Sequence, residues 1–71
     1  MGKREAWVIE GTKGDIVKYY KKIGCDSWSK DLGKAKLFDK EPKEKLLDAL
    51  LEAWKFEQVV AVSVTVIIKT G

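Results

Sequence analysis

The chain has 71 residues and carries 14 Lys and Arg against 11 Asp and Glu, a formal net charge of +3. Hydrophobic residues make up 45% and charged residues 35%, a balance typical of a folded domain rather than of a disordered tail. There is no histidine, which removes the usual general base near neutral pH and the commonest metal ligand. We therefore expect one small domain over residues 1–71 that is not an enzyme and holds no metal or cofactor.

The chain contains a single cysteine, Cys25, so no internal disulfide can stabilise the fold. With no histidine to activate the thiol, Cys25 is a poor candidate for a catalytic nucleophile. A domain of this length buries only about 60% of the surface that its unfolded chain exposes. Because neither a disulfide nor a metal compensates for this small core, we expect copies of the chain to share a core as a homodimer or a larger oligomer.

The first part of the chain predicts a β-hairpin. Residues 5–10 are rich in aromatic and β-branched side chains, which favours a strand. Gly11 and Gly14 bracket a turn, and residues 15–23 form a second extended run. Within that run Val17, Tyr19 and Ile23 share one face, which we take as the core face.

The opposite face of this second strand then presents a tyrosine between two lysines: Lys18, Tyr20 and Lys22. Bases stack on aromatic rings and lysines pair with phosphates, so this face predicts a site for a nucleotide or a single strand. The alternative is a solvated strand face with the tyrosine packed on lysine stems. The only arginine is Arg4, which does not favour sequence-specific DNA recognition.

Residues 24–33 predict a polar loop around one large aromatic side chain, Trp28. Trp28 either plugs the open end of the sheet or forms an exposed anchor for a ligand or partner. Asp26 and Asp31 lie on either side of Trp28. We interpret them as turn-capping residues rather than as metal ligands or an acid–base pair.

The sequence next predicts a short strand over residues 34–38 and a helix from about Pro42 to Lys55. Asp39 is a candidate cap, and Glu41 with Pro42 at the first helical position is the alternative. An apolar stripe at helical spacing predicts the buried face: Leu46, Leu47, Leu50, Leu51 and Trp54. Three acidic residues lie off this stripe and are the candidate partner-binding face, the alternative being simple exposure to solvent: Glu44, Asp48 and Glu52.

The last predicted element is a strand over residues 59–68, in which valine dominates. One of its faces is wholly apolar and the other is mixed. Ten residues of strand span about 33 Å, more than one short helix can cover on both faces. We therefore predict self-association through Val59–Ile68 or its mixed face. The predicted fold is α+β, a three- to four-stranded, mainly antiparallel sheet with one helix on one face.

The longest apolar run is also this strand of about ten residues, whereas a membrane-spanning helix needs about 20. The first five residues, Met-Gly-Lys-Arg-Glu, show no apolar stretch of the kind that secretory signals carry. These two observations predict a cytoplasmic protein that does not bind a membrane.

Trp28 follows a tyrosine-bearing hairpin, Ala35 and Phe38 lie in the short strand, and a leucine-rich helix precedes a closing valine strand. This order of elements resembles that of small single-domain bacteriophage proteins. The likeness covers roughly residues 6–68, and its motifs are generic because packing one helix on a curved sheet produces the same spacings. The resemblance implies the host cytoplasm as the location. Some phage proteins of this size are counter-defence factors that bind a host immune protein or sequester a nucleotide signal.

We therefore expect a non-catalytic binding protein that captures a host defence factor or an anionic nucleotide ligand, with Tyr20, Lys18, Lys22 and Trp28 as ligand-binding residues. The alternative is a structural or regulatory module of a phage or host assembly that binds no small ligand. The two alternatives differ in whether a nucleotide binds the tyrosine–lysine face.

Overall fold

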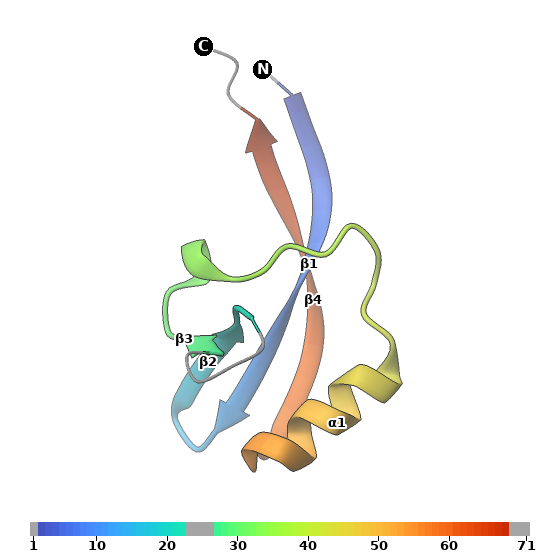
Figure 1. The fold of residues 1–71 in the computed structure, drawn as a ribbon. Coiled ribbons are helices and arrows are strands. Elements are labelled where there is room, and N and C mark those ends of the chain that lie inside the picture. The colour runs from blue at the N-terminus through green and yellow to red at the C-terminus, as the bar shows by residue number, and fades with distance from the viewer. Residues whose placement is uncertain (1, 23–26, 69–71) are drawn as a thin grey trace.

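A computed structural model describes residues 2–22 and 27–68, which form a four-stranded antiparallel sheet with one α-helix (Figure 1). The strand order is β3-β2-β1-β4. The α+β fold expected from the sequence is therefore confirmed. The elements in chain order are β1 (Gly2–Lys13), β2 (Ile16–Tyr20), β3 (Trp28–Ser29), the 3₁₀ helix η1 (Leu32–Lys34), α1 (Glu44–Trp54) and β4 (Gln58–Ile68).

The hairpin of β1 and β2 has a shorter turn than the sequence predicted. Lys13 pairs with Ile16, so that only Gly14 and Asp15 form the connection. Gly14 has a φ of 59°, the left-handed conformation that two-residue hairpin turns require and glycine adopts without strain. Gly11 lies inside β1 and is buried, so the prediction that the turn begins at Gly11 was wrong.

The prediction of which face of β2 packs into the core was also wrong. Tyr20 is only 6% exposed, whereas Val17 is 38% exposed. Lys18 pairs with Gly11, and side chains of paired residues share a face, so Tyr20 lies on the face that also carries Ile9. That face is covered by aromatic side chains from later parts of the chain, which a count of apolar residues along β2 alone cannot reveal. Ile23, also assigned to the core, lies outside the described residues.

The segment expected to form a third strand, residues 34–38, makes only one bridge with the sheet. The Trp7 amide donates to the Phe38 carbonyl at 2.9 Å, and the Phe38 amide donates to the Trp7 carbonyl at 2.8 Å. The Lys36 amide also donates to the Tyr20 carbonyl at 2.9 Å. The regular third strand is instead β3, inside the predicted polar loop, where Trp28 pairs with Tyr20.

The helix α1 begins at Glu44, two residues later than predicted, and packs against β4. Its N-cap is Lys43, which makes no side-chain capping bond. Neither predicted cap is used, and the Asp39 carboxylate instead accepts from the Arg4 guanidinium at 2.9 Å. Leu47, Leu50 and Leu51 of the predicted apolar stripe are half-buried, but Leu46 and Trp54 are 38% and 42% exposed.

The buried hydrophobic side chains lie in the middle of β1 and at the end of β2: Ala6, Val8, Ile9 and Tyr20. The molecule measures 41 × 23 × 22 Å. Figure 1 shows the reason for its length, because the Gly2 end of β1 and the Ile68 end of β4 project together beyond the other elements. In the part of the chain that the structure describes, no helix is long and apolar enough to cross a membrane.

Candidate ligand-binding pocket

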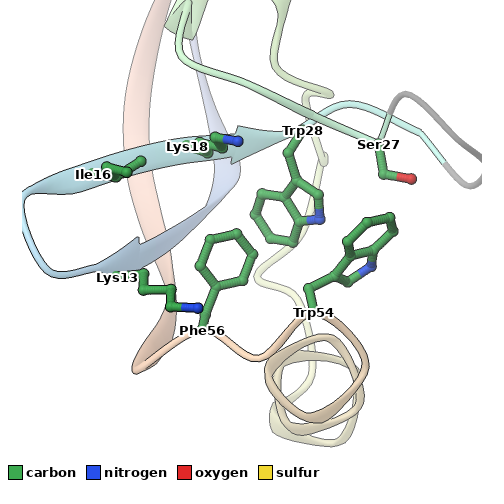
Figure 2. Close-up of a pocket in the computed structure, with 7 residues that line it drawn as sticks. All are labelled: Lys13, Ile16, Lys18, Ser27, Trp28, Trp54 and Phe56. Atoms are coloured by element: carbon green, nitrogen blue, oxygen red, sulfur yellow. The ribbon is translucent and has the colours of Figure 1, made fainter.

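A pocket of about 390 Å³ opens where the end of β1, β2, β3, the end of α1 and the connection from α1 to β4 meet (Figure 2). Three aromatic rings and two lysines dominate its walls, and we call it the aromatic–lysine pocket. Its lining residues are Lys13, Ile16, Lys18, Ser27, Trp28, Trp54 and Phe56.

Trp28 is the centre of the aromatic cluster that forms the pocket wall. Its ring centroid lies 4.5 Å from that of Phe56 and 6.5 Å from that of Trp54. Behind the pocket, the edge-to-face contact with Tyr20 has a centroid separation of 5.6 Å. Tilted and edge-to-face contacts at these separations are the favourable geometries for aromatic pairs. The cluster therefore gives the pocket a wall in which each ring supports its neighbour.

The chain reversal after α1 brings Trp54 and Phe56 to this wall. Lys55 between them has a φ of 59°, which ends the helix in the left-handed conformation. Phe56 then lies over Gly11 of β1, where an added Cβ would come within 3.0 Å of three Phe56 ring atoms. The missing side chain at Gly11 thus makes the space in which Phe56 meets Trp28.

Among the described residues, none is a hydrogen-bond partner for the indole nitrogen of Trp28, although this nitrogen is buried from solvent. Figure 2 shows this nitrogen on the side of the ring that faces Trp54. A buried N–H without an acceptor is costly, and natural structures usually supply one from the protein, water or a ligand. An acceptor that reaches this N–H would therefore remove that cost.

The two lysines give the pocket a positive charge. Lys13 is exposed at the end of β1 and Lys18 is half-buried on β2. Figure 2 shows Lys13 extending toward Phe56 and Lys18 extending toward Trp28. Among the described residues that line the pocket, none is acidic. Its electrostatics therefore favour an anionic group beside the aromatic wall.

The structure brings together two of the four residues predicted to bind a ligand. Lys18 and Trp28 line the pocket. Tyr20 supports Trp28 from behind and is buried, so the expectation that its ring is exposed for stacking was wrong. Lys22 is exposed, follows the end of β2 and does not line the pocket.

The sequence interpretation missed five of the seven lining residues, and Lys13, Trp54 and Phe56 are the three of these that supply a charge or an aromatic ring. Trp54 was assigned to the core because it continues the leucine stripe of the helix. The available signal was the pair of aromatic residues on either side of Lys55, which places two large rings at the end of the helix. A recess formed at such a helix end is more apparent from the fold than from helical periodicity.

The acidic residues predicted to bind a partner are all exposed on α1: Glu44, Asp48 and Glu52. Glu44 and Asp48 also line a second pocket, of about 350 Å³, between α1 and β4. Their role in binding a partner stays a prediction.

Asp31, the acidic residue of the Trp28 loop that the structure describes, bonds to the backbone of its own loop. The Asp31 carboxylate accepts from the Gly33 amide at 2.9 Å and thereby caps η1. Asp26 and Cys25 lie outside the described residues. Within the described ranges, no group of three or more acidic or cysteine side chains is placed to hold a metal ion.

Comparison of the chain with models of protein families, with curated proteins and with solved structures found no match. The resemblance to small bacteriophage proteins therefore stays a prediction.

Proposed function

We propose that the chain is a non-catalytic binding protein that captures an anionic nucleotide ligand, one per chain, in the aromatic–lysine pocket. The observation that carries the proposal is the meeting of Trp28, Trp54 and Phe56 beside Lys13 and Lys18. The host cytoplasm of a bacteriophage-infected cell is the setting that the resemblance implies for such a protein.

The aromatic wall suits the base of a nucleotide. Trp54 is 42% exposed, so part of its side chain remains accessible to a ligand. Stacking of a base on an aromatic side chain contributes about 1–3 kcal/mol and tolerates any base. Trp28 and Phe56 hold each other by contact, which limits the ordering cost of binding.

The two lysines suit the phosphate groups of the same ligand. They stand on neighbouring strands, Lys13 on β1 and Lys18 on β2, at the pocket that the aromatic wall closes. An ammonium group binds phosphate as a point charge and does not impose the planar geometry of arginine. A ligand with a planar base and an adjacent phosphate therefore satisfies both kinds of lining residue.

The Trp28 N–H adds a requirement for a hydrogen-bond acceptor. Ring nitrogens and carbonyl oxygens of nucleobases are such acceptors. A ligand that supplies one removes the cost of the unpartnered donor, whereas an apolar ring of the same size does not.

Calorimetric titration with ADP and with the dinucleotide pApA tests the proposal, with adenosine and inorganic phosphate as separate probes. We expect one ADP or one pApA per chain and weaker binding of adenosine or phosphate alone. The charged contacts should also make the affinity for ADP fall as salt is added.

Matched variants locate the site. Lys18→Ala and Lys13→Ala should each weaken ADP binding, and Lys22→Ala, which removes a lysine outside the pocket, should not. Trp54→Ala should weaken binding, whereas Leu46→Ala, at a similarly exposed position on α1, should leave it unchanged. Absence of binding by the unmodified chain, or equal effects of Lys18→Ala and Lys22→Ala, would refute the proposal.

The second candidate is a protein-interaction module that binds no small ligand. One observation favours it, because Glu44 and Asp48 border a pocket that Pro42 and Leu47 also line, which combines charge with apolar surface. Charge reversal at Glu44 and Asp48 should then abolish binding to a basic protein partner while ADP binding stays unchanged.

A further inference from the structure

One edge of β4 pairs with none of the residues that the structure describes. The sheet order β3-β2-β1-β4 makes β4 the edge strand, and β1 occupies its other side. Trp7 of β1 directs its N–H and C=O to Phe38, away from β4. Ser63, which lies opposite Trp7, therefore forms a non-hydrogen-bonded pair with it and directs its own N–H and C=O to the free edge. By the two-residue repeat of a strand, Ala61, Thr65 and Ile67 do the same.

This edge lacks the features by which proteins normally prevent strand pairing. Residues 58–68 contain no charged residue and no proline, and most are β-branched. Edge strands are usually protected by charges, proline, bulges or a covering segment. Among the described residues, no segment of the chain pairs with β4 on this side.

The two ends of the free edge differ in a complementary way. At one end Ile67 is 57% exposed. At the other end the pocket of about 350 Å³ between α1 and β4 has an apolar part and an acidic part. The apolar part is lined by Pro42, Leu47, Val59, Val60 and Ala61, and the acidic part by Glu41, Glu44 and Asp48. Because Val60 points to the opposite face from Val59 and Ala61, a pocket that touches all three lies along the edge of the strand. An exposed apolar side chain and a recess that can accept it therefore lie six residues apart on one strand edge.

We propose that β4 pairs antiparallel with β4 of a second copy about a two-fold axis at Val64, so that Ile67 of each copy fills the other copy's pocket beside Ala61. In this register Ser63 of one copy hydrogen-bonds with Thr65 of the other, and Ala61 pairs with Ile67. Ile67 and Ala61 extend to the same face of their strands, which is the face that the pocket requires. The pairing ends at Ala61, where α1 approaches the edge.

A second copy is the occupant because the arrangement is self-complementary. Antiparallel pairing of one strand with its own copy brings each end of the edge to the opposite end, so a single interaction forms twice. Such pairing also joins the two sheets into one of eight strands. In that sheet the half-buried valines Val62, Val64 and Val66 form one apolar surface across both copies.

Sedimentation equilibrium over a range of concentrations tests this interface. The unmodified chain should show a mass of about 16 kDa, twice the 8.0 kDa of one chain. Thr65→Pro should remain monomeric, because its N–H faces the free edge and its loss leaves the ladder with β1 intact. Circular dichroism should confirm that the variant stays folded.

Ile67→Lys tests the same interface without changing the backbone. We expect the dissociation constant of the dimer to rise about a hundredfold or more, because the dimer loses two buried aliphatic side chains, one from each copy. Val17→Lys is the matched control, because Val17 is an exposed strand residue on β2, away from β4, and its replacement should leave the dimer unchanged.

A monomer at every concentration would overturn the proposal, and so would a dimer that both Thr65→Pro and Ile67→Lys leave intact. Pairing through β4 does not involve the aromatic–lysine pocket. The Thr65→Pro monomer should therefore still bind ADP. ADP binding and dimer formation are thus measured independently, and a negative result for one does not decide the other.

Discussion

The two ends of the sheet are built differently. At the end that holds the aromatic–lysine pocket, strands, helix and loop converge, and Ile9, Tyr20 and Ser27 are at most 6% exposed. At the other end β1 and β4 continue as a two-stranded ribbon, where residues 2–5 are exposed together with Thr65 and Ile67. An isolated two-stranded ribbon is marginally stable in water. The comparison teaches that one end forms a recess by itself, whereas the exposed ribbon at the other end would gain stability from the proposed pairing with a second copy.

Replacement of the most buried side chain at the converged end should have the largest effect. Ile9→Ala should lower the free energy of unfolding by about 2–5 kcal/mol, because it leaves a cavity under the aromatic cluster. Ile16→Ala, at a residue that is 47% exposed, should cost less than about 1 kcal/mol. Urea unfolding measures both changes, and equal losses would contradict the difference between the two environments.

Gly11→Ala should have the next largest effect. The added Cβ would meet the Phe56 ring at 3.0 Å, so the ring must move, at a cost of about 1–3 kcal/mol. Because the ring centroids of Phe56 and Trp28 are 4.5 Å apart, the tryptophan fluorescence should change too. Gly2→Ala is the matched control on the ribbon, where an added Cβ meets nothing within 4 Å. A Gly11→Ala variant as stable as Gly2→Ala would show that Phe56 does not depend on this space.

Lys55→Gly should stabilise the chain by about 1 kcal/mol. Lys55 has a φ of 59°, a conformation that glycine adopts without the steric cost of a side chain. Lys45→Gly, inside α1, should instead destabilise it by about 1 kcal/mol, since glycine is a poor helix former. Thermal unfolding followed by circular dichroism measures both, and changes of the same sign would contradict the assigned end of α1.

The smallest effect is expected for an ion pair at the ribbon. Nη1 of Arg4 and Oδ1 of Asp39 are 2.9 Å apart, and the two side chains are 47% and 81% exposed. Exposed pairs of this kind contribute about 0–1 kcal/mol, because water and salt screen them. A double-mutant cycle with Arg4→Ala and Asp39→Ala should therefore give a coupling energy below about 0.5 kcal/mol. A coupling several times larger would mean that the ribbon is held more firmly than its exposure indicates.

Much of the fold could be predicted from local patterns. The β-branched run that forms β4 and the glycine at the hairpin turn act through short-range physics, so their positions follow from the sequence. The leucine stripe predicted α1 for the same reason, although the helix begins two residues later than predicted, since Lys43 is its N-cap and neither Asp39 nor Glu41 caps it.

The candidate site was harder to predict because it depends on contacts between distant residues. Lys18 and Trp28 were identified by their chemistry. Tyr20, however, contacts Trp28, which in turn contacts Phe56, and Tyr20 and Phe56 are 36 positions apart in the sequence. No periodicity within β2 contains that information. The prediction of an aromatic ring beside lysines on β2 was thus right about Lys18, but the rings beside it in the pocket are those of Trp28, Trp54 and Phe56 rather than that of Tyr20.

The most direct test of the proposed pocket is a titration with ADP in which the indole N–H signals of the three tryptophans are followed by NMR. Trp28 and Trp54 line the pocket, whereas Trp7 does not and serves as an internal control. We predict that the Trp28 signal moves most, because its unpartnered N–H gains an acceptor, that the Trp54 signal also moves, and that the Trp7 signal stays in place. Signals of Trp28 and Trp54 that remain unchanged at saturating ADP would contradict the assignment of this pocket as a nucleotide site.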